Sequence, residues 1–578
     1  MSFGNPTTRK VYCLLTLSLI ALSQVALAMN TWLPYMTAHA QKYGGTMVVA
    51  HWEDPLSMNP DAQIDDAGAA LHRVIYNWLV TFDYDYNIIP DLAYDWDVSE
   101  DGKTYTFYLY ENVTWHDGVP FTSADVKWTF DAIKEFHGVA YTDIKCDNIL
   151  SIETPDDYTV VFHLAEPYAP FLGFLAWYGT HIMPKHIWEP YVAQNISWLD
   201  PSIEELEKPV GTGPFKLEEW KRADHITLVA NEDYFKGRPY LDKIIYRIIP
   251  DPMVATQALY AGEVDLLHHR PPLEEIKVIN ATEGLIATVE PSLSRWYIGF
   301  NLAKSPFDDV RVRRAIAYAI NRTEVVEKAM AGYGFPAEGC YIPGIAWAYN
   351  PDAKLPPYDP VKAEELLNES GYLRGPDGIR FTMTYTCWTG AEEVDIGQVI
   401  MDNLREVGIE VLLTSLEFHV WIDRVTVKKD FDIALCDGWQ GPDPANLKIR
   451  VGAGEVVNFA GYENSEVERL LAEGDVEVDL EKRKEIYFRI QEILAEDLPY
   501  IWLADLTSFY IHKTKFHGFP WSEARGKAGF NVYTYVWIEE APAPAPAIGI
   551  TTVAAIVVVV GAAAVVAVYF VRKRGKTG

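Results

Sequence analysis

The chain carries an apolar segment near each end, and basic residues flank each segment on its terminal side. At the amino-terminal end, Arg9 and Lys10 precede an apolar run that leads to the small-residue site Ala26-Leu27-Ala28. This layout is typical of a cleavable secretory signal, and a second such site, Ala38-His39-Ala40, allows a cut as late as residue 40. The sequence therefore predicts that residues 1–28 are a signal peptide and that the rest of the chain is exported.

The carboxyl-terminal apolar segment is long enough to cross a membrane. Residues 548–571 contain no charged side chain, and as a helix they would be about 36 Å long, against roughly 30 Å for a hydrocarbon core. The basic tail 572–578 is expected in the cytoplasm. Alanine and proline alternate over 541–547, which favours an extended stalk of about 20 Å. We therefore expect a single-pass protein of the cell membrane, with its folded body on the extracellular side.

Length and charge narrow the class of the exported body. About 500 residues are too many for one hydrophobic core, so two or three domains are expected. The chain has 81 acidic and 49 basic residues, a net charge of −32. Such a charge repels nucleic acid, which is therefore excluded as a partner.

Two helices of the body are marked by apolar residues that recur every three or four positions. The first covers 309–320, and we expect its arginines Arg311, Arg313 and Arg314 to lie on its solvated flanks. The second covers 360–371, with a proline at its first position and a glycine at its end.

Residues 380–439 alternate between strand and helix patterns. Strands are predicted at 381–387, 409–413 and 431–436, and a helix at 392–407. Right-handed crossovers make such strands parallel, and the segment is therefore expected to form one side of an open α/β sheet.

The ends of these strands provide candidate binding residues. Ligands of open α/β sheets bind beyond the carboxyl ends of the strands. That rule selects Trp388 after the first strand and Asp437, Gly438 and Trp439 after the third. Ordinary core packing is the alternative for each tryptophan.

Four cysteines remain once the signal is removed: Cys146, Cys340, Cys387 and Cys436. Outside the cell they can pair, with three possible connectivities. Cys387 and Cys436 lie at equivalent depths of two predicted strands, which favours a disulfide between these two.

The sequence contains no usual catalytic spacing. His-Glu-x-x-His, Gly-x-Ser-x-Gly and Cys-x-x-Cys are all absent. The adjacent pairs His116-Asp117 and His268-His269 are expected to be structural, since neighbouring side chains rarely converge on one ion. We therefore predict a protein with no cofactor and no metal that is not an enzyme. A membrane-anchored extracellular hydrolase and a structural surface protein remain as alternatives of other classes.

One segment combines more local structural signals in a fixed order than any of the patterns above. Residues 92–130 combine a turn at 99–102, a strand at 104–109, a second turn at 116–118 and a helix start at Thr122 and Asp125. The spacing of Thr122 and Asp125 is that of a capping box.

This segment resembles the family 5 solute-binding proteins of ABC importers, the dipeptide/oligopeptide-binding group. Further stretches match the family in the expected order: YGGTMVVA, DPLSMNP, VGTGPFKLEEW, NEDYFKGRPYLDKIIYRII, AGEVDLL, FNLAKSPFDDVRVRRAIAYAINR, YDPVKAEELLNESGY, GWQGPDP and IYFRIQEILAEDLPYIWL. The signal, stalk and membrane segment are similar to the archaeal form of this family.

The resemblance implies a two-lobed α/β fold of the periplasmic-binding-protein type II, with an extra inserted domain. Such a receptor closes on its solute by hinge bending and delivers it to the permease and ATPase subunits of an importer. The implied parts are lobe one (44–90, 210–293 and 505–540), the inserted domain (91–209) and lobe two (294–504), with hinge strands near 296–301.

The resemblance also implies a ligand site. Gly438 and Trp439 match the family's ligand-contacting Gly-Trp pair. Trp52 and Asp54, at the DPLSMNP motif, complete the predicted ligand-binding residues together with those at the strand ends.

The nature of the ligand depends on one departure from the family pattern. Peptide-binding members place an aspartate three residues after the tryptophan, where it pairs with the ligand's ammonium group. Here that position is Pro442, and Asp443 follows it. Asp437 and Asp443 are the alternatives for this charge. Because the resemblance is to a family whose members mostly bind peptides, a peptide is the favoured ligand, and an oligosaccharide held by aromatic side chains is the alternative.

Overall fold

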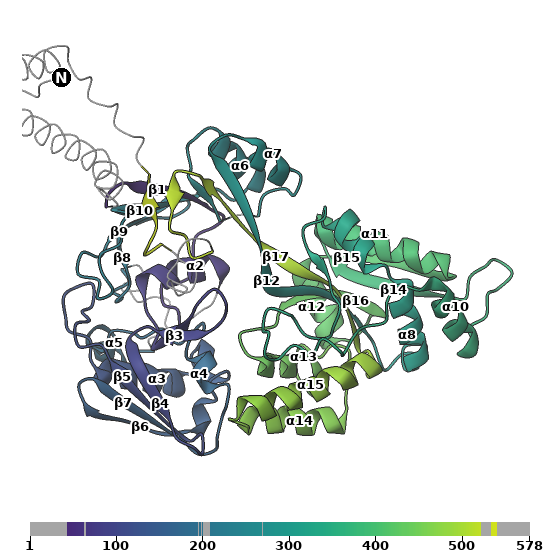
Figure 1. Cartoon of the computed structure of the whole chain (residues 1–578), viewed down its shortest axis with the longest axis horizontal. Coiled ribbons are helices and arrows are strands. Elements are labelled where there is room, and N and C mark those ends of the chain that lie inside the picture. The colour runs from purple at the N-terminus through teal and green to yellow at the C-terminus, as the bar shows by residue number, and fades with distance from the viewer. Residues whose placement is uncertain are drawn as a thin grey trace, which may run out of the picture. The chain divides into compact units, whose positions relative to one another are not determined.

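The computed structural model (Figure 1) describes most of the exported body. The described residues are 43–62, 65–194, 196–197, 199, 208–268, 270–521 and 533–539. The predicted signal peptide, the stalk 541–547, the membrane segment 548–571 and the tail 572–578 lie outside them. Within the described residues, no helix is both long enough and apolar enough to cross a membrane.

An eleven-stranded sheet runs through the body. Its order is β15 (Ile409–Leu416), β14 (Phe381–Trp388), β16 (Ile433–Trp439), β12 (Leu285–Phe300), β17 (Tyr500–Lys513), β11 (Leu266–Leu267), β1 (Thr46–His51), β10 (Lys243–Ile248), β9 (His225–Ala230) and β8 (Phe215–Lys221), with β13 (Phe335–Pro336) paired to β17. The two long strands β12 and β17 run antiparallel side by side (Figure 1). The strands from β11 to β8 fall within the residues predicted for lobe one, and β16, β14 and β15 fall within those predicted for lobe two. The predicted two-lobed α/β fold is confirmed.

Helices cover these strands and connect them. They are α2 (Asp66–Ile75), α3 (Ser123–Phe136), α4 (Phe171–Phe174), α5 (Lys185–Val192), α6 (Pro252–Tyr260), α7 (Glu275–Ala281), α8 (Val310–Ala319), α9 (Arg322–Glu324), α10 (Pro360–Glu369), α11 (Ala391–Glu406), α12 (Phe418–Ile422), α13 (Lys448–Val451), α14 (Ser465–Val476) and α15 (Leu480–Asp497). Short 3₁₀ or π turns occur at 139–141, 146–148, 325–329, 423–427 and 444–447. In lobe two, one cluster of buried apolar side chains draws on residues from Leu293 to Ala504.

A separate four-stranded antiparallel sheet follows the first strands of lobe one. Its order is β4 (Ala93–Val98), β5 (Thr104–Leu109), β7 (Thr159–Leu164) and β6 (Ile149–Asp156). Helix α3 begins with the predicted capping box, in which the Thr122 backbone N–H donates to Asp125 Oδ2 at 2.9 Å. The remaining short strands are β2 (Val80–Phe82) and β3 (Ile88–Pro90), which pair, and β18 (Phe516–His517) and β19 (Trp537–Ile538).

The strand and helix alternation predicted for 380–439 is present as β14, α11, β15, α12 and β16. Strand β14 pairs in parallel with both β15 and β16. Gly408 ends the turn after α11 at a φ of +84°, a conformation that L side chains rarely adopt. The carboxyl ends of β14 and β16 therefore lie at the same edge of the sheet.

The predicted disulfide between Cys387 and Cys436 is wrong. All four cysteines are free thiols in the part of the chain that the structure describes. Strands β14 and β16 pair with Thr386 opposite Ala434, so Cys387 is level with Leu435. Successive side chains of a strand point to opposite faces, and this shift of one residue directs the two thiols to different faces of the sheet.

The position predicted for Arg313 is also wrong. Its guanidinium is buried rather than solvated, and it donates to the backbone carbonyls of Phe307 at 2.8 Å and Leu498 at 3.1 Å. Helix α8 therefore buries one of its arginines to satisfy loop carbonyls, which the apolar stripe alone does not reveal.

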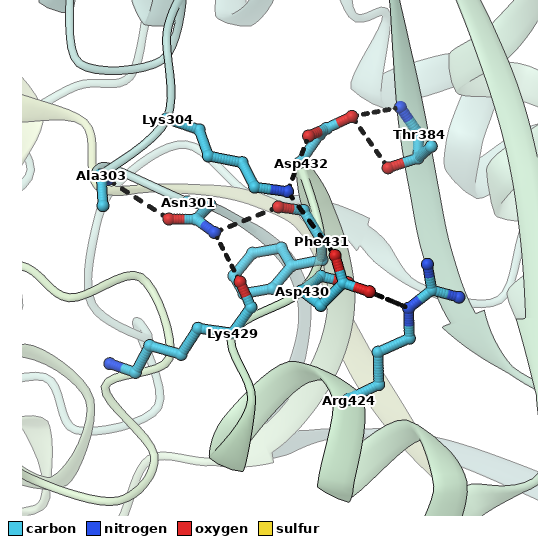
Figure 2. A network of polar contacts seen from close by, with 9 residues as sticks. All are labelled: Asn301, Ala303, Lys304, Thr384, Arg424, Lys429, Asp430, Phe431 and Asp432. Atoms are coloured by element: carbon cyan, nitrogen blue, oxygen red, sulfur yellow. Dashed lines mark hydrogen bonds and ion pairs between the residues drawn. The ribbon is translucent and has the colours of Figure 1, made fainter.

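A polar network fixes the amino-terminal end of β16 (Figure 2). The Asn301 side chain donates to the carbonyls of Lys429 at 2.8 Å and Phe431 at 3.1 Å. Asp432 accepts from the backbone N–H and the hydroxyl of Thr384, both at 2.9 Å, and from Lys304 Nζ at 3.3 Å. These contacts tie the end of β12 and the middle of β14 to β16. Because a strand is extended and regular, fixing this end also sets the position of the carboxyl-terminal end of β16.

Candidate functional site

A cavity of about 810 Å³ lies at the carboxyl end of β16, and we call it the central cavity. Its wall on the side of lobe two includes Asp437, Gly438 and Trp439. A second cavity of about 380 Å³, the side cavity, adjoins it. The two share the following lining residues: Asp66, Arg73, Tyr84, Tyr178, Ser508 and Tyr510.

Trp439 forms part of the central cavity wall, as the strand-end rule predicts. Its ring stacks on Trp177, with ring centroids 4.0 Å apart and planes inclined by 11°. Gly441 leaves room for this ring, because a Cβ there would lie 2.1 Å from Leu293 Cδ1 and 3.2 Å from Trp439 Cζ2. The indole is therefore held in one orientation at the cavity.

Gly438 is required by packing behind the cavity. A Cβ at this position would lie 2.1 Å from Arg450 Nη2. That nitrogen donates to the Trp439 carbonyl at 2.8 Å. The absence of a side chain at Gly438 therefore allows Arg450 to approach and hydrogen-bond to the backbone of Trp439.

Asp437 presents a carboxylate to the central cavity. The side chain is exposed to the cavity, but the surrounding protein removes part of the water from its carboxyl, and this desolvation raises the pKa of the carboxyl. The nearby negative charges of Glu393 and Glu392 raise it further. Burial also raises the pKa of Glu393, which accepts from Trp388 Nε1 at 2.7 Å. A cation near Asp437 would relieve this repulsion.

Asp443 has a different role from the one predicted as an alternative. Its two oxygens accept from Arg483, from Nη2 at 2.6 Å and from Nη1 at 2.7 Å, and Oδ1 also accepts from the Ala445 backbone N–H at 2.8 Å. The carboxylate is buried and fully engaged within lobe two. Asp437 rather than Asp443 thus faces the cavity.

The other predicted residues are more scattered. Trp388 packs against Trp421 and is not among the described residues that line either cavity. Trp52 lines the side cavity. Asp54 accepts from Trp220 Nε1 at 2.8 Å and from the Ala223 backbone N–H at 2.6 Å, so it holds the turn between β8 and β9.

Several cavity residues escaped the sequence analysis. Arg73 comes from α2, Tyr84 from the turn between β2 and β3, Trp177 and Tyr178 from the segment after α4, and Tyr510 from β17. Only Arg73 carries a local signal, because it is an arginine within a helix whose neighbouring positions are buried. The aromatic residues are brought together by the fold alone.

Three contacts join residues from the two sides of the cleft. Besides the Trp177–Trp439 pair, Arg270 Nη1 lies 2.6 Å from Glu392 Oε2, and Lys145 Nζ lies 2.7 Å from Asp475 Oδ2. Both ion pairs join segments that precede β12 to lobe two.

Among the described residues, no group of three or more His, Cys, Asp or Glu side chains could hold a metal ion. His116 accepts from the Gly211 backbone N–H at 3.2 Å through Nδ1, and its Nε2 lies 3.0 Å from the Gly213 carbonyl. Burial lowers the pKa of His116 to about 4. These contacts give it a structural role.

Comparison with known proteins places the chain in a family. Residues 87–450, more than half of the chain, match the model of the bacterial extracellular solute-binding proteins, family 5 Middle. The chain is 30% identical over 492 residues to the oligopeptide-binding protein AppA of Bacillus subtilis, covering 81% of this chain and 87% of that protein. It is 28% identical over 507 residues to the dipeptide-binding protein of Escherichia coli, covering 82% and 92%.

Solved structures agree with this assignment. The periplasmic binding protein DppA of Helicobacter pylori, solved in complex with the peptide STSA, superposes with a TM-score of 0.71 at 29% identity, covering 86% of this chain and 99% of that one. The cleft between two lobes and the matched length lead to one assignment. The chain belongs to family 5 of the extracellular solute-binding proteins, a family of binding receptors and not of enzymes.

Proposed function

We propose that this protein is the extracytoplasmic receptor of an ABC importer that captures dipeptides or oligopeptides. The lobes close around a peptide in the central cavity, and the receptor delivers it to the permease, which the ATPase subunits drive. The observation that carries the proposal is the central cavity itself, which lies between lobes and is walled by Trp439 and Asp437. Relatives named as peptide-binding proteins support the same ligand class.

Asp437 is the residue that would pair with the peptide's ammonium group. Its carboxylate faces the cavity beside two other acidic side chains. The other alternative, Asp443, is engaged by Arg483. An ammonium ion at Asp437 would offset charges that repel one another.

An oligosaccharide is the second candidate ligand, because aromatic rings make up much of the cavity wall. Tyr84, Tyr86, Trp177, Tyr178, Trp439 and Tyr510 all line it. Stacking on such rings suits the apolar faces of sugars. Sugars carry no ammonium group, so Asp437 separates the two candidates.

The ligand class is tested with protein purified from its native host without denaturation. Mass spectrometry of the released solute identifies it as peptide or sugar, and calorimetry with the same compound measures its affinity. We expect peptides, with affinities near micromolar so that reopening releases them. Release of oligosaccharides only, together with normal binding by Asp437→Asn, would favour the second candidate.

The membrane attachment is a further part of the proposal. A signal peptide, the stalk 541–547 and the helix 548–571 would hold the body outside the cell, in a layout similar to the archaeal form of the family. A chain ending at Glu540 should be released from membranes and still bind its ligand. Retention of this shortened chain in the membrane fraction would contradict the anchor, and loss of binding would show that the tail belongs to the fold.

A further inference from the structure

We propose that Arg73 binds the ligand's terminal carboxylate, so that this receptor selects peptides with a free carboxyl end held on the side of lobe one. The inference rests on the proposed function, because it assigns the second end of the same cleft. It concerns residues that no prediction from the sequence had selected.

Arg73 stands on a rigid support at the junction of the two cavities. It lies in the last turn of α2 and lines both of them. The neighbouring positions Val74 and Ile75 are fully buried, as is Leu71. The backbone that carries the guanidinium is therefore fixed before a ligand arrives, which limits the entropy lost on binding.

Phenol groups orient the guanidinium. Arg73 Nη2 donates a short hydrogen bond to the Tyr178 hydroxyl, and the guanidinium carbon lies 5.3 Å from the centroid of the same ring. Tyr84 and Tyr510, with ring centroids 6.3 Å apart, line both cavities beside it. Phenols are neutral at physiological pH, so these contacts hold the cation without cancelling its charge.

Arginine suits a carboxylate for two reasons. Its guanidinium stays protonated at any physiological pH, and its planar fork of N–H donors matches the two oxygens of a carboxylate. A half-buried cation has also lost part of its hydration, and an incoming anion offsets that loss.

The charges of the two cavities are unequal. Besides the shared Asp66 and Arg73, the central cavity is lined by Asp85, Glu290 and Asp437, all acidic. Among the described residues, the side cavity adds no acidic side chain to Asp66, and its Arg270 is paired with Glu392. The potential is therefore less negative at the side cavity than at the central cavity. A peptide with its ammonium at Asp437 and its carboxylate at Arg73 follows that gradient.

Matched peptide libraries test the assignment. Two tetrapeptide libraries of uncharged residues, one with free carboxyl ends and one amidated, are offered to the full chain in detergent, and bound peptides are quantified by mass spectrometry. The best-retained sequence is then measured by calorimetry in both forms. We expect amidation to weaken binding to the unaltered protein by at least tenfold.

Variants connect this loss to Arg73. Arg73→Gln should weaken the free peptide at least tenfold and leave the amidated peptide unchanged, so that the two forms bind alike. Arg405→Gln is the matched control, because that side chain is 66% exposed on α11, and it should preserve the full difference. Tyr178→Phe removes only the orienting hydroxyl and should weaken the free peptide alone, by a smaller factor. It also serves if Arg73→Gln does not fold.

The outcomes distinguish the proposed function as a peptide receptor from the assignment of Arg73. If neither library binds, the proposed function fails. If peptides bind but amidation has no effect in any protein, the assignment of Arg73 is overturned and the proposed function stands. An amidated peptide with one glutamate that binds as tightly as the free peptide would assign the site to acidic side chains and overturn the claim about the carboxyl end.

Discussion

Two aspartates six positions apart show how similar residues divide between a cavity wall and internal support. Asp437 and Asp443 flank the Gly-Trp pair, and both are acidic side chains beside the end of β16. Asp443 is engaged by Arg483, whereas Asp437 faces the central cavity. The two residues are of the same type and lie close together in the sequence, and the presence of Arg483 beside Asp443 gives them different surroundings.

Trp439→Ala should weaken ligand binding by about 2 kcal/mol or more, because it removes a rigid aromatic wall from a closing cleft. Its cost in the free energy of unfolding should stay below that of Trp502→Ala, where a fully buried ring is lost at a cost of about 3–5 kcal/mol. Calorimetry and thermal unfolding of both variants measure these effects. Normal binding by a Trp439→Ala protein that melts far lower would show that the ring only supports the core.

Peptide affinity should depend on pH through Asp437. Ammonium binding needs the ionised carboxylate, and the raised pKa of Asp437 means that protonation begins at a higher pH than for an ordinary aspartate. Affinity should therefore be greatest near neutral pH and decline as the pH falls through the raised pKa. Asp437→Asn should bind more weakly at pH 7 and should lack this component of the decline in titrations between pH 7.5 and 4.5. An identical pH profile in both proteins would exclude this role.

At the scale of elements, β16 illustrates how one strand connects structure with function. Its amino-terminal end is fixed by the Asn301 and Asp432 network (Figure 2). Its carboxyl-terminal end carries the cavity residues. A strand rises about 3.3 Å per residue, so the anchor also sets how far Asp437 reaches toward the cavity.

Asp432→Ala should lower the free energy of unfolding by about 2–3 kcal/mol, because the Thr384 backbone N–H and hydroxyl and Lys304 lose their shared acceptor. The adjacent Asp430 serves for comparison, since its side chain is 65% exposed and forms ion pairs with Arg424 at 3.4 Å and Lys304 at 3.9 Å. Asp430→Ala should cost less than about 1 kcal/mol. Urea unfolding compares the two, and equal losses would mean that the contacts of Asp432 with Thr384 add no stability of their own.

Helix α2 should carry a pH-dependent part of the stability through His72. This side chain is buried, and burial lowers its pKa to about 4 although Nε2 lies 2.9 Å from the Ser57 carbonyl. The unfolded chain takes up this proton near pH 6.5, so stability is lost as the pH falls from 6.5 toward 4, by up to about 3 kcal/mol. In His72→Gln the fall between pH 7 and pH 4.5 should be smaller by about 2–3 kcal/mol in urea unfolding. Parallel curves would contradict the shift.

At the scale of the whole body, β12 and β17 carry the chain between the lobes. Their pairing shifts register between Pro291 and Arg295. There the fully buried Arg295 donates to Asp505 Oδ1 from Nη2 at 2.5 Å and from Nε at 2.8 Å. An irregular ladder bends more easily than a regular one, and we expect the hinge at this shift.

Ligand should compact the protein and raise its melting temperature, because a solute that binds only the folded form stabilises it by mass action. Arg270→Gln removes the ion pair with Glu392, so the variant without ligand should be more open than the unaltered protein. X-ray scattering measures both effects. A scattering profile that saturating ligand leaves unchanged would contradict hinge closure.

Local patterns predicted much of lobe two and part of the site. The strands and helix of 380–439 and the cap of α3 follow from side-chain period and turn chemistry, which act over a few residues. The strand-end rule selected Asp437, Gly438 and Trp439, all of which line the central cavity. The family resemblance added the two-lobed fold.

Tertiary structure decided what depends on distant partners. Asp54 and its partner Trp220 are separated by 166 positions, and Asp443 and Arg483 by 40. Local period does not encode such pairs, nor the one-residue register that separates Cys387 from Cys436. Arg73 and its ring of tyrosines come from four segments that meet only after folding. The sequence by itself thus determined the elements and the family, while packing between remote segments determined which side chains face the two cavities, because burial and charge compensation are properties of the assembled fold.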